Sequence, residues 1–282
     1  MTKRDQVDKQ KQQFSGEWAI ILGGSSGFGL AAVEKLAGHG MNIAVLYREM
    51  TAVEKPVREK FSRIQAATGT TILPFNSNAL DAEARAEFIR QFSAACGGKS
   101  CVRLLLHSIA RGNLKPLLAG GNDPATAAGS AGTLSVEDIQ LTGYAMSSSL
   151  LDWARLLVKE GLFRQDARII GLTSQGAHRF WEGYAAVSMA KASLESLTTY
   201  MAVELGRYGL RTNLIQAGIT ETPSLKRIPS SRQLIEFSTA RSPLGRMTKP
   251  GDVAGVIYLL CTDEAAWING AVIHVDGGEH CL

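Results

Sequence analysis

The sequence predicts an α/β protein built as one doubly wound, parallel sheet. Three short apolar runs, Trp18–Leu22, Asn42–Tyr47 and Thr71–Phe75, are each followed by a longer stretch of another character. Those stretches, at about 27–39, 52–67 and 82–96, carry apolar residues at helical spacing. Repeated strand–helix–strand units indicate parallel strands with helices on both faces.

The later strands continue this pattern to the end of the chain. They are predicted at Val102–Leu106, Ala167–Leu172, Leu210–Ile215 and Ala271–Val275. No repeat or second core interrupts the series, so a chain of 282 residues is expected to form a single domain over 17–282. Residues 1–16 are predicted to be a polar tail. Residues 119–133, rich in Gly, Ala and Ser without periodicity, are predicted to be a mobile surface loop.

Composition excludes several classes of protein. No apolar run approaches the roughly 18 residues that span a bilayer, and the start of the chain is too polar for a signal peptide. We therefore expect a cytoplasmic protein without membrane contact. A net charge of +4, with no basic run interleaved with aromatics, does not indicate nucleic-acid binding. The four cysteines lack CxxC spacing, so neither a disulfide framework nor a metal site is expected.

A glycine-rich turn joins the first predicted strand to the first predicted helix. It consists of Gly23, Gly24, Ser25, Ser26, Gly27, Phe28 and Gly29. Glycines let the backbone turn tightly and approach a ligand, and the N–H groups at the start of the helix attract an anion. Such a turn can also serve close packing alone. Its position at the head of an α/β pattern favours binding of a dinucleotide pyrophosphate, as in a Rossmann-like sheet.

The end of the second strand indicates which dinucleotide binds. Enzymes that use NAD usually carry a carboxylate there, whereas this chain carries Arg48, whose guanidinium suits the 2′-phosphate of NADPH. NADH stays possible, because Glu49 is adjacent and Ser26 stands where a basic residue is common. Asn78, after the third strand, is a candidate to cap the adenine, although Asn in such a loop is equally a turn former.

Tyr184 and Lys191 are the candidate chemical groups. They are seven residues apart, which is about two helical turns and places both side chains on one face of a predicted helix. Ordinary short-chain dehydrogenases carry Tyr-x3-Lys, but the corresponding residue here is Val187, which cannot donate a proton. A lone Tyr and Lys at this spacing are often only a solvent-facing stripe.

Together these motifs resemble the short-chain dehydrogenase/reductase family, and within it the bacterial enoyl-acyl-carrier-protein reductases. The resemblance covers nearly all of 17–282. It is carried by His107-Ser108-Ile109-Ala110, by Tyr184-x6-Lys191 with the following Ala-Ser-Leu-Glu, by Arg211–Gly218, and by Val275–Gly278. The stretch from Tyr184 to Met247 is most similar to the NADPH-linked branch of these reductases.

The resemblance implies a set of roles. Besides the glycine turn, Arg48 and Asn78, it assigns to the cofactor Ser108, Ile109, Ala110, Lys191, Ala217, Gly218 and Thr220. It implies an acyl carrier protein bearing the enoyl thioester as partner. It also implies a homotetramer that assembles through the predicted long helices at 135–160 and 182–207.

The implied reaction is hydride transfer to the β-carbon of a trans-2-enoyl thioester in fatty-acid biosynthesis. Tyr184 would donate a hydrogen bond to the thioester oxygen as negative charge develops, and Lys191 would bind the nicotinamide ribose and hold a positive charge near the phenol. Moving the hydroxyl by three helical residues shifts it by roughly 4.5 Å, towards the more distant oxygen of an enoyl substrate. Many relatives have a second tyrosine where this chain has Ser174, so either Ser174 or Thr173 substitutes, or that donor is missing.

The segment 220–241 is expected to cover the substrate. We hypothesise that Leu225, Ile228 and Phe237 wall an acyl slot. The neighbouring bases Lys226, Arg227 and Arg232 would attract the acidic carrier protein. A solvated amphipathic helix pair is the equally simple interpretation. His107, which follows a buried strand, is interpreted as a structural histidine.

Two other functions stay open. One is an NADPH-dependent carbonyl reductase of the same fold, such as a 3-oxoacyl or alcohol/ketone enzyme, in which Tyr184 would reach a differently placed carbonyl. The other is a non-catalytic dinucleotide-binding sensor, since a fold does not imply an activity. Val187 argues against the first, and the presence of both Tyr184 and Lys191 argues against the second.

Overall fold

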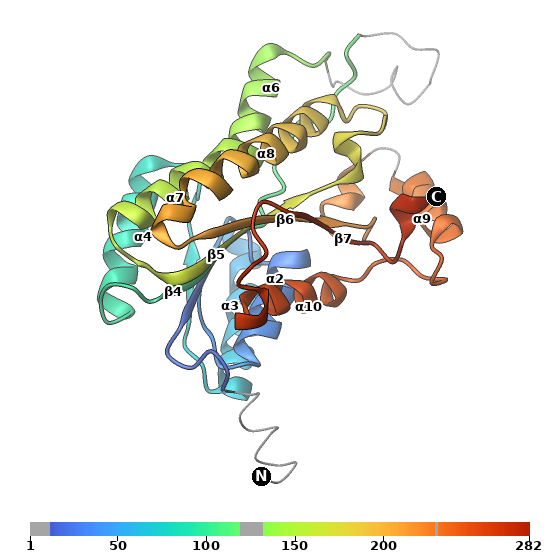
Figure 1. Cartoon of the computed structure of the whole chain (residues 1–282). Helices are drawn as coiled ribbons and strands as arrows, with labels where there is room; N and C mark the ends of the chain where they lie inside the picture. Colours follow the sequence, from blue (N-terminus) through green and yellow to red (C-terminus); the bar gives the residue numbers. More distant parts are fainter. Residues whose placement is uncertain (1–11, 119–131, 229–230) are drawn as a thin grey trace.

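The computed structural model describes residues 12–118, 132–228 and 231–282, and it contains a seven-stranded parallel sheet (Figure 1). The strands are β1 (Trp18–Leu22), β2 (Asn42–Tyr47), β3 (Ile72–Asn76), β4 (Val102–His107), β5 (Phe163–Thr173), β6 (Arg211–Ala217) and β7 (Val272–Val275). Their order across the sheet is β3-β2-β1-β4-β5-β6-β7. The predicted Rossmann-like fold class is confirmed. The loop predicted at 119–133 lies almost entirely outside the described residues.

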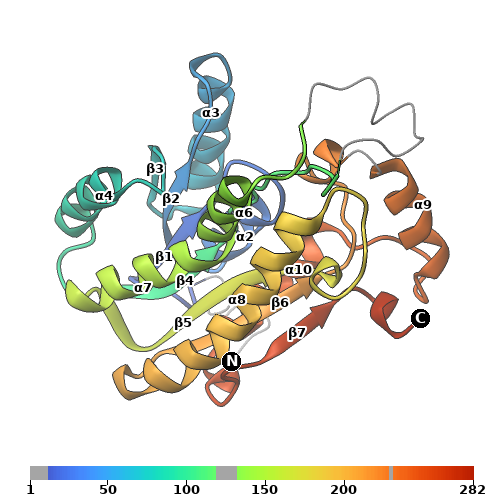
Figure 2. The same ribbon diagram turned by 90° about the horizontal axis from the view of Figure 1, so that it is seen from above.

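Helices cover both faces of the sheet (Figures 1 and 2). One face packs against α2 (Gly27–Ala37), α3 (Thr51–Thr68) and α10 (Pro250–Cys261). The other packs against α4 (Ala82–Ala95), α7 (Ser149–Lys159) and α8 (Ala185–Glu204). Helix α6 (Val136–Gly143) lies against α8 and leads into α7 through a π-helical turn, Tyr144–Ser148. Helix α9 (Ser231–Arg241) lies near the C-terminus.

The central strand β1 shows why the sheet is buried on both faces. Ala19 and Ile21 belong to the core shared with α2 and α10, whereas Trp18, Ile20 and Leu22 belong to the core shared with α4, α7 and α8. Side chains alternate along a strand, so a continuous apolar run supplies both cores at once. Such a strand is stable only between two helical layers, as the sequence pattern indicated.

The folded part of the chain begins before residue 17, where the sequence analysis placed the end of a polar tail. Phe14 is only 3% exposed, and its N–H donates to the carbonyl of His39 over 3.1 Å. Its ring also packs edge-on against Tyr258 of α10. The buried ring of Phe14 thus anchors the residues just before β1 to the fold. The sequence did not indicate this, because most of the neighbouring residues are polar. Throughout the described ranges, no helix combines the length and apolar character needed to cross a bilayer.

The order of the strands determines where a ligand can bind. From β1 the chain adds β2 and β3 on one side, and then crosses to add β4 to β7 on the other. The connections leave β1 and β4 in opposite directions, which opens a crevice at the carboxyl ends of these neighbouring strands. The glycine turn follows β1, and Ser108, Ile109 and Ala110 follow β4, so both predicted motifs reach this crevice.

We predict that Gly29→Ala destabilises the fold although it lies on a helix. A Cβ at this position would lie 2.2 Å from the carbonyl oxygen of Gly23, so the turn would have to move, at a cost of about 1–3 kcal/mol. Gly255→Ala, within α10, is the matched control, because its Cβ would meet nothing within 4 Å. There alanine should stabilise by roughly 0.5–1 kcal/mol. Urea denaturation measures both, and equal stability of the two variants would contradict this packing role.

Candidate active site

A cavity of about 610 Å³ lies at the carboxyl edge of the sheet. It is bordered by the segments that follow β1, β2, β3, β4, β5 and β6. Nearly every residue that the sequence analysis proposed for the site lines it. These are Gly23, Ser25, Ser26, Gly27, Phe28, Arg48, Asn78, Ser108, Ile109, Ala110, Ser174, Tyr184, Lys191, Ala217, Gly218 and Thr220. Within the glycine turn, Gly24 and Gly29 do not line it.

The glycines of the first turn have different tasks. Gly23 has φ +87°, and a Cβ there would lie 2.5 Å from the carbonyl oxygen of Ser108, so this position needs glycine for both conformation and space. Gly24 and Gly29 serve packing, since their Cβ atoms would clash with Val45 and with the backbone of Gly23. Helix α2 starts at Gly27 without a side-chain cap at Ser26. The unpaired N–H groups of its first turn are therefore available to an anion.

A cationic and an anionic side chain, Arg48 and Glu49, follow β2. Arg48 is exposed and lines the cavity. The carboxylate of Glu49 accepts a hydrogen bond from the Ser25 hydroxyl at 2.9 Å, which ties it to the glycine turn. Across the cavity mouth Asn78 holds its own loop, because its side-chain oxygen accepts the N–H of Leu80 at 3.3 Å. Asn78 thus forms a turn and lines the cavity as well.

Tyr184 is the residue immediately before α8, not a residue within it. It occupies the N-cap position with φ −95° and ψ 3°, and its carbonyl accepts the N–H of Ser188. Burial raises the pKa of the phenol, and a hydrogen bond from Ser174 acts in the opposite direction. The phenol therefore stays protonated at neutral pH and can donate. Val187, one turn later, is buried and borders the same cavity.

Lys191 extends from α8 to the end of β5. Its ammonium donates to the carbonyl oxygen of Leu172 at 2.6 Å. Burial lowers the pKa of the amine to about 8, and Glu195 acts in the opposite direction.

The hydroxyl groups of Thr173 and Ser174, which follow Leu172, have different hydrogen-bond partners. The Thr173 hydroxyl donates to Glu195 at 2.6 Å, so its one proton is already used. The Ser174 oxygen accepts the N–H of Gly176 at 3.2 Å, which leaves its own proton for Tyr184 or a ligand. Of the two hydroxyls that the sequence analysis offered as a second donor, Ser174 is the one that remains available. Gly176 is required beneath Tyr184, because a Cβ there would lie 2.5 Å from its ring.

Sequence reasoning missed Gln175 and Trp181, which also line the cavity. Both amide atoms of Gln175 are buried and have no hydrogen-bond partner among the residues that the structure describes. A buried, unpaired amide is costly unless a ligand satisfies it. No motif marks this residue, and its position next to Ser174 is the one signal that the sequence offers.

His107 has the structural role that was expected of it. Its ring is 1% exposed, and Nε2 lies 2.8 Å from the hydroxyl of Ser149. Burial, followed by repulsion from Lys191, lowers the pKa of the imidazole to about 3. A ring that is neutral throughout the physiological range and hydrogen-bonded in the core does not act as an acid or base towards the cavity.

The segment 220–241 borders the cavity in part. Leu225 and Ile228 line it, as expected, but Phe237 does not. Phe237 packs edge-on against Trp181 at 5.4 Å between ring centroids, and Trp181 supplies the wall. Among the bases, only Arg227 lines the cavity. Lys226 pairs with Glu221, and Arg232 lies 3.8 Å from Glu236.

Comparison with known proteins decides the family. A family model described as enoyl-(acyl carrier protein) reductase matches residues 23–280. The chain belongs to this family of short-chain dehydrogenases/reductases. The predicted resemblance is thereby confirmed, and with it membership of an oxidoreductase family.

Within the short-chain dehydrogenase/reductase family, relatives carry different names. A probable 2,4-dienoyl-CoA reductase of Bacillus subtilis is 30% identical over 92% of this chain and 95% of that protein. Galactitol 2-dehydrogenase of Rhizobium johnstonii is 24% identical over 97% and 98%. The crystal structure of an enoyl-[acyl-carrier-protein] reductase (NADH) from Aquifex aeolicus is 26% identical, covers 95% and 98%, and superposes with a TM-score of 0.77.

Proposed function

We propose that this protein is a cytoplasmic, NADPH-dependent enoyl thioester reductase that acts on trans-2-enoyl-acyl carrier protein in fatty-acid biosynthesis. The observation that carries the proposal is the placement of Tyr184. Its protonated phenol lies in the cavity one turn before Val187, the position at which a ketone reductase would carry its acid. The family match and the Aquifex aeolicus enzyme support the same reading.

The cavity fits a nicotinamide dinucleotide. The N-terminus of α2 and the turn from Gly23 to Gly27 suit the pyrophosphate, and Arg48 suits a 2′-phosphate. When bound, the dinucleotide supplies a hydride for the β-carbon of the substrate. The chain must then stabilise the negative charge that develops on the thioester oxygen.

We assign that task to Tyr184. Its raised pKa keeps the proton on the phenol, so it donates a hydrogen bond where charge appears in the transition state. Ser174 is placed to support this hydroxyl or to act as a second donor. Lys191, anchored on the Leu172 carbonyl, is proposed to hold the ribose. The unpaired amide of Gln175 is the further group available to a bound thioester.

Two relatives favour other substrates, and NADPH oxidation measured with several thioesters separates these alternatives. The Bacillus subtilis relative suggests a 2,4-dienoyl thioester, which is also reduced by addition to a conjugated system. The Rhizobium johnstonii relative favours a carbonyl or alcohol substrate instead. A non-catalytic sensor is disfavoured, because Tyr184 and Lys191 both face the cavity.

The acyl carrier protein and the homotetramer also stay proposals. Arg227 at the cavity wall, with Lys226 and Arg232 nearby on the surface, supports docking of an acidic carrier. Exposed apolar side chains on α6 and α8 support assembly through these helices. They are Val136, Leu141, Met189, Tyr200 and Val203.

We predict that Tyr184→Phe abolishes most of the reduction of crotonyl-CoA, lowering kcat roughly 10²–10³-fold, because a donor to the developing oxyanion is lost. The measurement is NADPH absorbance with crotonyl, 2,4-hexadienoyl and acetoacetyl thioesters. Tyr208→Phe is the matched control, since this phenol is 48% exposed and does not line the cavity. Turnover of acetoacetyl-CoA alone, or an unchanged rate in Tyr184→Phe, would contradict the proposal.

We predict that Arg48→Ala raises the KM for NADPH at least roughly tenfold and leaves the KM for NADH unchanged. A hydrogen bond to a charged group contributes about 1.5–3 kcal/mol, and only NADPH carries the 2′-phosphate. Steady-state kinetics with each dinucleotide measure this, with Arg155→Ala as the control, because Arg155 is exposed and does not line the cavity. Equal changes for both dinucleotides would refute a role for Arg48 in the choice of cofactor.

A further inference from the structure

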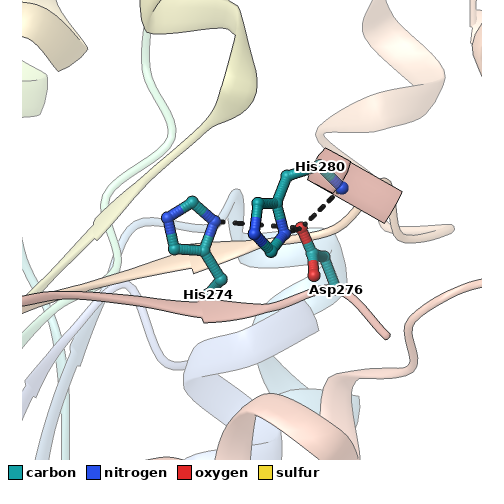
Figure 3. A group of neighbouring side chains, drawn as sticks. All are labelled: His274, Asp276 and His280. Carbon is teal, nitrogen blue, oxygen red and sulfur yellow. Dashed lines mark hydrogen bonds and ion pairs between the residues drawn. The ribbon is translucent and has the colours of Figure 1, made fainter. Parts of the chain in front are cut away.

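Three potential metal ligands gather at the C-terminal end of the sheet, outside the cavity. They are His274 in β7, Asp276 just after it, and His280 in the final turn (Figure 3). Each offers one ligand atom, and these atoms all lie within 4.8 Å of one another. Nδ1 of His280 is 2.8 Å from Oδ2 of Asp276, and Nδ1 of His274 is 4.0 Å from the same oxygen.

The backbone explains why these residues meet. His274 and Asp276 are two positions apart, so they point to one side of an extended strand. Gly277 and Gly278, with φ of +63° and +87°, then reverse the chain. This reversal brings the ring of His280 against that of His274, with centroids 3.9 Å apart and ring planes inclined at 36°. The two imidazoles thus stand side by side over one carboxylate (Figure 3).

Neighbouring groups hold these side chains in place. Asp276 is 5% exposed, and its Oδ1 accepts the N–H of Gly278 at 3.0 Å. The side-chain nitrogen of Gln216, in β6, lies 3.2 Å from Nδ1 of His274. Because an amide nitrogen only donates, Nδ1 of His274 carries a lone pair and not a proton. This is the tautomer that can bind a metal through Nδ1.

We propose that His274, Asp276 and His280 bind a divalent transition-metal ion of the zinc class. Two imidazole nitrogens and one carboxylate oxygen are the donor set that such ions prefer, with a further position left for water. The ion would take the place of two hydrogen bonds, the one between His280 and Asp276 and the one that Nδ1 of His274 accepts from Gln216. Cys281 is not included, because its sulfur faces Nε2 of His280, the nitrogen directed away from Asp276.

The ion would fasten the end of the chain beside the cavity. Asp276 backs Gly218, where an added Cβ would lie 3.0 Å from it, and Gly218 lines the cavity. Glu279, next to His280, accepts a hydrogen bond from Ser238 of α9 at 2.8 Å. Helix α9 in turn contributes Leu234 to the cavity wall. The three ligands are therefore positioning residues, and the site stands whether or not the proposed reaction is correct.

A simpler reading needs no ion. Asp276 also accepts the N–H and the Nδ1–H of His280, which is a sufficient reason for the turn to exist. No metal site was expected from the sequence, because the four cysteines lack CxxC spacing. Binding measurements separate the two readings.

The test is titration of the untagged, chelator-treated full chain with Co²⁺, followed by visible absorbance, and then displacement by Zn²⁺. We expect one ion per chain with an intense, low-coordinate Co²⁺ spectrum, and a rise in Tm with Zn²⁺. His274→Gln and His280→Gln should each weaken binding at least roughly tenfold and lose the rise in Tm. His178→Gln is the matched control, because His178 also pairs with a carboxylate, Glu195, at 2.7 Å, but has no second imidazole beside it.

Wild-type protein that is folded but gives no saturable Co²⁺ spectrum would overturn the proposal, whatever the variants do. Equal binding by wild type and both substituted variants would overturn it too, since the ion would then lie elsewhere. Loss of binding in His178→Gln alone would have the same meaning. Circular dichroism on each variant shows that lost binding is not lost folding.

Discussion

The ammonium of Lys191 is buried at the carboxyl end of β5, and the polar groups around it are arranged to tolerate that charge. Its direct partner is a neutral one, the carbonyl of Leu172 at 2.6 Å. Glu195 supplies the compensating negative charge from a distance, and burial still lowers the pKa of the amine to about 8. A buried charge with so little compensation persists only where surrounding structure or function requires it.

Neighbouring residues show the effect of this charge. His107 must stay neutral, and repulsion from Lys191 adds to burial in lowering its pKa. The carboxylate of Glu195 is held by Thr173 at 2.6 Å and by His178 at 2.7 Å. With Thr173 committed to that task, Ser174 is the hydroxyl at the end of β5 that stays available beside Tyr184. The charge on Lys191 thereby influences which of these two neighbouring hydroxyls can face a ligand.

Much of the fold followed from local patterns. The strand predicted at 18–22 and the helix predicted at 27–39 agree with β1 and α2 within two residues, because burial on two faces imposes a continuous apolar run. Strand β5 begins at Phe163, earlier than the predicted start at Ala167. The residues between them are polar and pair irregularly with β4, so no apolar run marked this part of the strand. The cavity-lining residues of the glycine turn were predictable, because only glycine lets the backbone come so close to a neighbouring segment or a ligand.

Other features depend on tertiary contacts that spacing cannot reveal. Phe237 has the right character for an acyl slot, but Trp181 packs against it and forms the wall instead. Gln175 stands out only because its amide is buried without a partner. Tyr184 and Lys191 were correctly brought together, yet Tyr184 caps α8 and does not share its regular face. The cluster of His274, Asp276 and His280 depends on a glycine reversal that folds the last turn back onto β7.

The pH dependence of kcat/KM for crotonyl-CoA reduction tests the central role of Lys191 most directly, since kcat/KM reports pKa values of the free enzyme. The amine carries its charge below its pKa of about 8 and loses it as the pH rises through that value. We expect kcat/KM to fall about tenfold per pH unit above pH 8. Tyr184, whose pKa is raised above its ordinary value, does not account for such a limb. Lys191→Arg stays charged at these pH values. Whatever its absolute kcat/KM, the decline of kcat/KM in this variant should therefore begin at a higher pH. A profile flat to pH 10, or the same decline in Lys191→Arg, would contradict the account.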